Sequence, residues 1–140
     1  MLNREIVFSR AGAGKSNKDI FTLQTDLTLT RITFGLIANP AYDSAGADWS
    51  SDGMWLVCDS TRDKISVKNS DIYKVELANL NNIQRMTTTT QTTEDASWSR
   101  ANGDIVYGSQ GSDPDNPINI WEMDTNGDNE AIFISSSVED

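Results

Sequence analysis

One sequence pattern returns in this chain after about 49 residues, and it limits the possible folds more than any other feature. The segment from Trp49 to Gly53, Trp-Ser-Ser-Asp-Gly, is echoed by Trp-Ser-Arg-Ala-Asn-Gly from Trp98 to Gly103. The residues after each tryptophan keep the same spacing, with Leu56, Cys58 and Ser60 in one copy and Ile105, Tyr107 and Ser109 in the other. A repeat of this length is typical of folds in which each unit buries its apolar face only against neighbouring units.

The register continues beyond these segments and also extends toward the N-terminus. Asp71–Val75 is matched by Asn119–Met123, and Arg85–Thr87 by Ala131–Phe133. An earlier copy comprises Ile6–Phe8, Asp19–Leu23 and Arg31–Thr33. The chain therefore contains three related units, the first of which lacks the segment that carries the tryptophan.

The spacing inside each unit predicts β-strands. Apolar residues alternate, for example at Leu56 and Cys58, which is the period of a strand with one buried face. Turn-forming pairs such as Asp52-Gly53 and Asn126-Gly127 separate the runs. A complete unit has four strands, and four antiparallel strands repeated at this period predict a blade of a β-propeller.

The motifs also resemble those of a known family. Trp-Ser-x-Asp-Gly, an alternating strand, Asp-Ile-Tyr and then Arg-x-Thr resemble the repeat of TolB-like propellers, whose consensus reads Trp-Ser-Pro-Asp-Gly with a later Ile-Tyr and Leu-Thr. The match spans nearly the whole chain, although Ser51 replaces the usual proline and the turn after Trp98 has one extra residue. The repeat is also similar to that of propellers attached to prolyl-oligopeptidase-type enzymes and of some polysaccharide lyases.

The number of units predicts an incomplete ring. We expect an all-β protein of eleven strands in about three blades, at residues 1–46, 47–93 and 94–140, with the first blade lacking its inner strand. Closed propellers usually have four to eight blades. Either the chain is a segment of a longer polypeptide, which we favour, or two or more copies close one ring as a homo-oligomer, with Ser135 to Asp140 lending a strand.

Composition excludes some partners. Eleven basic and 21 acidic residues give a net charge of −10, which disfavours binding to nucleic acids and to anionic membranes. No apolar run is long enough to span a bilayer, and residues 1–5 do not begin a signal peptide. TolB-like proteins are commonly exported, so the resemblance favours a periplasmic or extracellular location. The missing signal indicates either a cytoplasmic protein or a start codon inside a longer gene. The single cysteine, Cys58, is expected to be a buried core thiol.

Three local patterns suggest ligand sites, but each is better explained by a turn. The segment Ser9–Ser16 ends in Gly-Lys-Ser as a phosphate-binding loop does, yet a strand rather than a helix is expected after it. Asp124–Glu130 resembles a calcium loop but lacks glycine and glutamate at the required places. The acidic segment at Asp113, Asp115 and Asn116 is interrupted by prolines, and weak calcium binding there stays open.

The chain contains no histidine, which argues against an enzyme. A Ser-His-Asp triad is impossible without it, and the polysaccharide lyases that share the repeat depend on a histidine-bound metal. Paired acids such as Glu94 and Asp95, or Asp43 and Asp48, are typical of solvated charge. We therefore expect no catalytic residues, no metal and no cofactor.

The four tryptophans are expected to pack rather than to bind ligands. Trp49 and Trp98 recur with the repeat, so we assign them to the cores between blades. Trp55 is expected on a face that the next blade covers, and Trp121 shares the aromatic position of Phe21 and Tyr73.

These observations predict a rigid scaffold that binds a protein or peptide at the mouth of the propeller channel, where turns and inner strands present polar groups. The acidic side chains among the candidate binding residues favour a partner that is basic or bears an amine. The alternative is a substrate-gating propeller of a prolyl-oligopeptidase-type serine peptidase whose catalytic domain lies outside this chain. The candidate binding residues are Asp48, Ser50, Asp52, Glu94, Asp95, Ser97 and Ser99.

Overall fold

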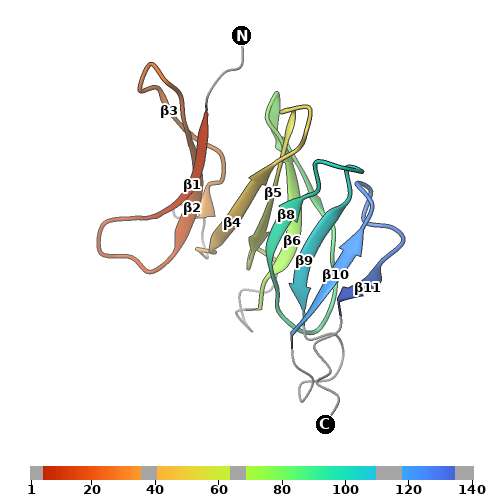
Figure 1. Ribbon diagram of the computed structural model, residues 1–140. Coiled ribbons are helices and arrows are strands. Elements are labelled where there is room, and N and C mark those ends of the chain that lie inside the picture. The colour runs from red at the N-terminus through yellow and green to blue at the C-terminus, as the bar shows by residue number, and fades with distance from the viewer. Residues whose placement is uncertain (1–4, 36–40, 64–68, 110–117, 135–140) are drawn as a thin grey trace.

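The computed structural model describes residues 5–35, 41–63, 69–109 and 118–134. These residues form eleven strands in three separate antiparallel sheets and no α-helix (Figure 1). They contain no helix that is long and apolar enough to cross a membrane. The predicted all-β fold of three blades is therefore confirmed. The blade limits at 46/47 and 93/94 stay predictions.

Each sheet is built from strands that follow one another in sequence. The first blade contains β1 (Ile6–Ala11), β2 (Lys18–Leu23) and β3 (Leu29–Arg31). The second contains β4 (Ser44–Trp49), β5 (Trp55–Ser60), β6 (Asp71–Glu76) and β7 (Asn79–Arg85). The third contains β8 (Thr93–Trp98), β9 (Ile105–Ser109), β10 (Asn119–Met123) and β11 (Ala131–Ile134). As expected, the first blade has three strands, and β2 follows the glycine-rich segment where a phosphate-binding loop would require a helix.

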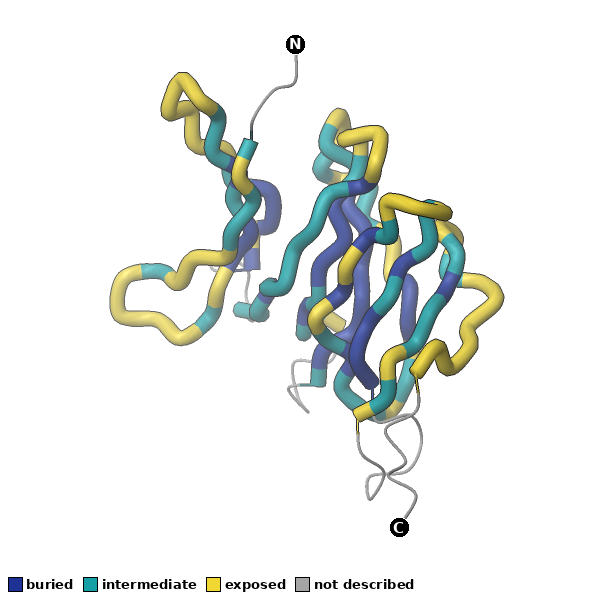
Figure 2. The backbone as a smooth tube through the Cα atoms, in the orientation of Figure 1, coloured by how far each residue is buried: buried dark blue, intermediate teal, exposed yellow. Residues whose placement is uncertain are grey.

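The blades stack face to face, with their buried segments concentrated in the middle of the stack (Figure 2). Two apolar cores lie between successive blades. The first core joins blades one and two and contains Ile20, Ile32, Leu56, Cys58, Tyr73 and Val75. The second joins blades two and three and contains Val57, Ile72, Met86, Ala96, Trp98, Ile105, Tyr107 and Met123. The alternating residues of the second blade therefore serve both cores, because successive side chains of a strand point to opposite faces.

The tryptophans take part in these cores as predicted. Trp49 packs against the first core, and Trp98 belongs to the second. Both hold the same register, since Trp49 pairs with Leu56 and Trp98 pairs with Ile105. Trp55 and Trp121 pack against the second core, so the third blade covers Trp55.

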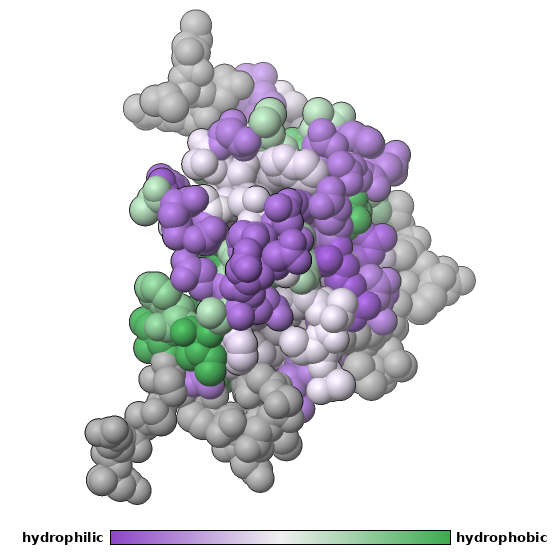
Figure 3. All heavy atoms as spheres, turned by 90° about the vertical axis from the view of Figure 1, so that its right-hand side faces the viewer, coloured by the Kyte–Doolittle hydropathy of each residue, from purple (hydrophilic) through white to green (hydrophobic). Residues whose placement is uncertain are grey.

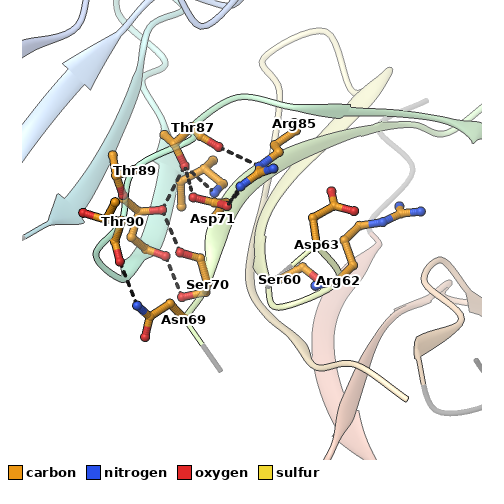
Figure 4. A network of polar contacts seen from close by, with 12 residues as sticks. Ser60, Arg62, Asp63, Asn69, Ser70, Asp71, Arg85, Thr87, Thr89 and Thr90 are labelled. Carbon is orange, nitrogen blue, oxygen red and sulfur yellow. Dashed lines mark hydrogen bonds and ion pairs between the residues drawn. The ribbon is translucent and has the colours of Figure 1, made fainter. Parts of the chain in front are cut away.

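Each of the first two blades contains an ion pair between a buried aspartate and an arginine of its outer strand. Figure 4 shows the pair of the second blade. Asp71 has no exposed surface, and its Oδ2 accepts hydrogen bonds from Arg85 Nε at 3.0 Å and from Arg85 Nη2 at 2.5 Å. Thr87 donates its hydroxyl to Asp71 Oδ1 at 3.2 Å and accepts the amide of Ile72 at 2.9 Å. This group, which we call the Asp-Arg-Thr clamp, ties the outer strand to the segment that leads into the next blade.

The clamp recurs in the first blade, as the sequence repeat implies. Arg31 pairs with the fully buried Asp19, and Thr33 donates to Asp19 Oδ1 at 2.9 Å. In the third blade, Asn119 and Ile132 hold the register positions of Asp71 and Arg85. The sequence alignment places Ala131 at the position of Arg85, one residue earlier than the strand pairing does.

Candidate partner-binding site

The structure separates the predicted site residues into three groups along the inner strands. Ser50, Asp52 and Ser99 lie in the turns that follow β4 and β8, at one end of the blades. Glu94 and Asp95 lie at the opposite end of β8. Asp48 and Ser97 are the last-but-one residues of β4 and β8, next to the turn end. The predicted binding residues are therefore not gathered in one continuous site.

A pocket of about 220 Å³ opens at the turn end, between the second and third blades. The turn after β4, the turn after β8 and the turn after β10 form its walls, while β5 and β6 contribute from below. The pocket contains two of the predicted residues, and two indole rings give it an apolar component. Its lining residues are Ser50, Ser51, Asp52, Trp55, Lys74, Trp98, Gly103 and Thr125.

Asp52 is the exposed carboxylate of this pocket. The hydroxyl of Ser50 donates to Asp52 Oδ1 at 2.6 Å, and the amide of Met54 donates to the same atom at 2.9 Å. These hydrogen bonds, the one from Ser50 first, hold the pKa of Asp52 below its usual value. Asp52 is therefore ionised at neutral pH. Among the described residues, both of these donors bond the same oxygen, Oδ1.

Lys74 forms the floor of the pocket, and sequence reasoning did not single it out. The residue is 8 % exposed, and its ammonium lies 5.1 Å from the centre of the Trp55 ring. It donates a hydrogen bond to the carbonyl of Thr125 in the third blade. Burial lowers the pKa of Lys74, and Asp124 opposes that shift. The sequence pointed to this burial only through spacing, since Lys74 lies two residues after Ile72 and therefore on the same face of β6.

Asp48 links the inner strands of two blades. Its Oδ2 accepts hydrogen bonds from the Ser97 hydroxyl at 2.8 Å and from the Trp98 amide at 2.9 Å. Its Oδ1 accepts the amide of Trp49 at 2.8 Å. These contacts give Asp48 and Ser97 a role within the fold, in addition to the binding role that the sequence predicted for them.

Glu94 and Asp95 lie beside Asp59 of the second blade. Asp95 has a positive φ of 55° and Gly46, at the equivalent place in β4, has 56°. Both mark a bulge of the inner strand, where the pairing register shifts. A Cβ at Gly46 would collide with Asp59 Oδ1, so the glycine makes room for that carboxylate. Burial, with further contributions from Asp95 and Glu94, raises the pKa of Asp59 to about 6.

This raised pKa predicts a pH-dependent stability. The ordinary pKa of an aspartate is 3.8, so between about pH 4 and pH 6 the folded chain holds a proton that the unfolded chain has lost. The free energy of unfolding should therefore fall as the pH rises through this window. Replacing Asp59 by asparagine should raise the free energy of unfolding at pH 7 by about 1–3 kcal/mol, because the neutral amide is cheaper to bury.

The measurement is urea unfolding of the native chain and of Asp59→Asn at several pH values. Asparagine can still accept the amide of Asp95, so the difference isolates the charge. The two curves should converge below about pH 4 and separate above pH 6. Curves that run parallel over this range would contradict the assignment.

The other residues that attracted attention in the sequence have structural partners. Asp124 Oδ1 accepts the amides of Asn126 at 2.8 Å and Asp128 at 3.0 Å, so the calcium-like segment is a tight turn between β10 and β11. Cys58 is buried, and burial raises its pKa to about 12. Within the described ranges, no three acidic, cysteine or histidine residues are grouped as metal ligands. Asp113, Asp115, Asn116 and Ser135–Asp140 lie outside the described residues.

Comparisons with solved structures identify the fold. The putative TolB from Agrobacterium tumefaciens superimposes with a TM-score of 0.74 and 21 % identity, covering 92 % of this chain and 44 % of that one. TolB from Acinetobacter baumannii gives 0.71 and 17 %, covering 96 % of this chain and 30 % of that one. A chain of a nidogen/laminin complex gives 0.71 and 11 %, covering 98 % and 46 %. These similarities show a TolB-like β-propeller fold.

The chain spans less than half the length of each of these three structures. No protein-family model and no curated protein matches its sequence. The shared fold does not establish the function, because one propeller architecture serves many functions.

Proposed function

We propose that this chain is a non-catalytic propeller scaffold that binds a protein or peptide in the pocket at the turn end, between the second and third blades. The observation that carries the proposal is the pocket itself, which combines the ionised Asp52 with the indoles of Trp55 and Trp98. Concave sites lined by aromatic rings and a few convergent polar groups are the usual form of a recognition site. The nidogen/laminin structure, a complex of two proteins, supports a role for this fold in protein association.

The charges in the pocket favour a partner that presents an amine or guanidinium group. Lys74 already contacts Trp55 and Thr125, so its positive charge is engaged inside the pocket. Asp52 is exposed and ionised, and the chain as a whole has a net charge of −10. A cationic side chain next to an apolar one would meet the carboxylate and the indole surface together.

Titration with short peptides tests this proposal. The probes are peptides in which lysine or arginine stands beside tryptophan or leucine. For peptides without tryptophan, the readout is the tryptophan fluorescence of the protein. For the other peptides, the readout is the fluorescence anisotropy of a label on the peptide. The variant Asp52→Asn keeps an oxygen that can accept from Ser50 and Met54 but removes the charge. We expect it to weaken binding about tenfold, the effect of one lost charge-assisted hydrogen bond.

Asp26→Asn is the matched control. Asp26 is an exposed aspartate in the turn after β2, and it accepts the amide of Thr28 at 2.9 Å much as Asp52 accepts that of Met54. This variant removes the same charge from a different blade and should bind like the native chain. Equal losses for both variants, or equal binding of peptides with glutamate in place of lysine, would refute the proposed site.

A further inference from the structure

Each of the three blades has a valine and an isoleucine at matching register positions on the same face. In the first two blades this face meets the next blade. In the second blade these residues have no exposed surface, because the third blade covers them. In the first blade Ile20 is 1 % exposed beneath the second blade. In the third blade Ile120 is 37 % exposed, with Ile118 at 49 % and Ile134 at 55 % nearby. The equivalent pairs are Val7 and Ile20, Val57 and Ile72, and Val106 and Ile120.

The exposed face of the third blade is also hollowed. A depression of about 170 Å³ is lined by Val106, Gly108, Ile118 and Ile120, with Glu94 and Asp95 at its rim. Gly108 contributes to this shape, since an added Cβ would lie 3.3 Å from Ile118. Figure 3, which views this side of the molecule, shows apolar surface next to a broad hydrophilic region. Exposed apolar patches with a polar rim are typical of interaction surfaces.

The first blade exposes the complementary face. Its Ile6, Phe8, Phe21 and Leu29 hold the register positions that Leu56, Cys58, Tyr73 and Ile83 hold in the second blade. In the second blade these four residues pack against the first blade. In the first blade Ile6 is 62 % exposed and Leu29 is 47 % exposed, while the rings of Phe8 and Phe21 stack at 6.0 Å.

Charge selects which faces can meet. Residues 94–140 contain eleven acidic residues and one basic residue, so they hold a net charge of −10, equal to that of the whole chain. Residues 1–46 contain five basic and four acidic residues. Two third blades placed against each other would therefore repel strongly, whereas a first blade meets a third blade without that cost. Arg10, exposed at the end of β1, adds a cation to the first blade.

We propose that the first blade of a second copy of this chain packs on the exposed face of the third blade, head to tail. Two copies related by a two-fold axis then make this contact twice and form a single ring of six sheets, which lies within the usual range for propellers. Each contact brings together the register positions that meet between consecutive blades within one chain, except that the first blade has no counterpart of the inner strands β4 and β8. It places the β1–β3 face over Val106 and Ile120, the counterparts of the covered Val57 and Ile72. This contact is separate from the pocket at the turn end.

Analytical ultracentrifugation of the full 140-residue chain tests the proposal. We expect a particle of twice the chain mass of 15.4 kDa. Ile120→Arg places a charge in the contact on the third blade, and Phe8→Arg places one on the first blade. Each variant alone should sediment as a single chain. An equimolar mixture should associate again, because one of the two contacts then joins two native faces.

This recovery on mixing separates loss of contact from loss of folding, since a misfolded variant would not restore it. Met54→Arg is the matched control, because Met54 is 58 % exposed in the turn after β4, away from both faces. It should sediment like the native chain. A native chain that stays monomeric over the accessible concentrations, or an Ile120→Arg variant that still forms the pair, would overturn the proposal. Peptide titration of the monomeric variants tests the turn-end pocket independently.

Discussion

Replacing Asp71 by alanine is expected to lower the free energy of unfolding by about 3 kcal/mol, because it leaves a partly buried guanidinium without its counterion. The carboxylate of Asp71 has no exposed surface and accepts bonds from Arg85 and Thr87. The side chain of Arg85 is 32 % exposed, so water compensates part of the loss. Urea unfolding followed by circular dichroism measures the change.

A double-mutant cycle shows whether the ion pair itself is responsible. Arg85→Ala should be at least as destabilising, because it leaves a fully buried carboxylate, and the two substitutions together should cost less than their sum. Asp19→Ala should cost a similar amount in the first blade, where Arg31 takes the place of Arg85. Full additivity of the Asp71 and Arg85 substitutions would show that the clamp does not act as a unit.

Trp98→Ala is expected to destabilise the chain by about 4 kcal/mol, the largest effect of a single core truncation here. Trp98 is 6 % exposed and lies in the core between the second and third blades. Its indole N–H donates to the carbonyl of Gly103 at 2.7 Å, which fixes the turn after β8. The substitution therefore removes a large apolar side chain and a hydrogen bond together.

The repeat supplies the comparison for this prediction. Trp49 holds the same register position, but it is only partly buried and packs at the edge of its core. Trp49→Ala should therefore lower the free energy of unfolding by about half as much as Trp98→Ala, because it removes less buried apolar surface. Equal losses for the two variants in urea unfolding would show that burial does not govern these sites.

The fold was predictable because its signals are local and repeated. The alternation at Leu56 and Cys58 predicts a strand, and Asp52-Gly53 predicts a turn. The period of about 49 residues then predicts the same strand and turn in the next blade. Each strand pairs with its neighbour in sequence, so no distant pairing had to be guessed.

The site was harder to predict, because its geometry depends on contacts between blades. Asp48 matched the pattern of a binding acid, yet its carboxylate contacts the backbone of a strand 50 residues away. Lys74 reaches the carbonyl of Thr125 across the core. Asp59 acquires its raised pKa from burial that only the stacked blades create. The repeat does place Asp71 and Arg85 at matching positions in two blades, but their pairing depends on the strand register.

The pairing of sequence neighbours within each sheet has a consequence for how such chains evolve. Since no strand of the described sheets pairs with a strand of another blade, a segment of about 49 residues encodes one complete set of paired strands. Duplicating or deleting one segment changes the number of units without altering the strand pairing within any other blade. The Val–Ile pairs at matching positions in all three blades are the trace that such duplication would leave.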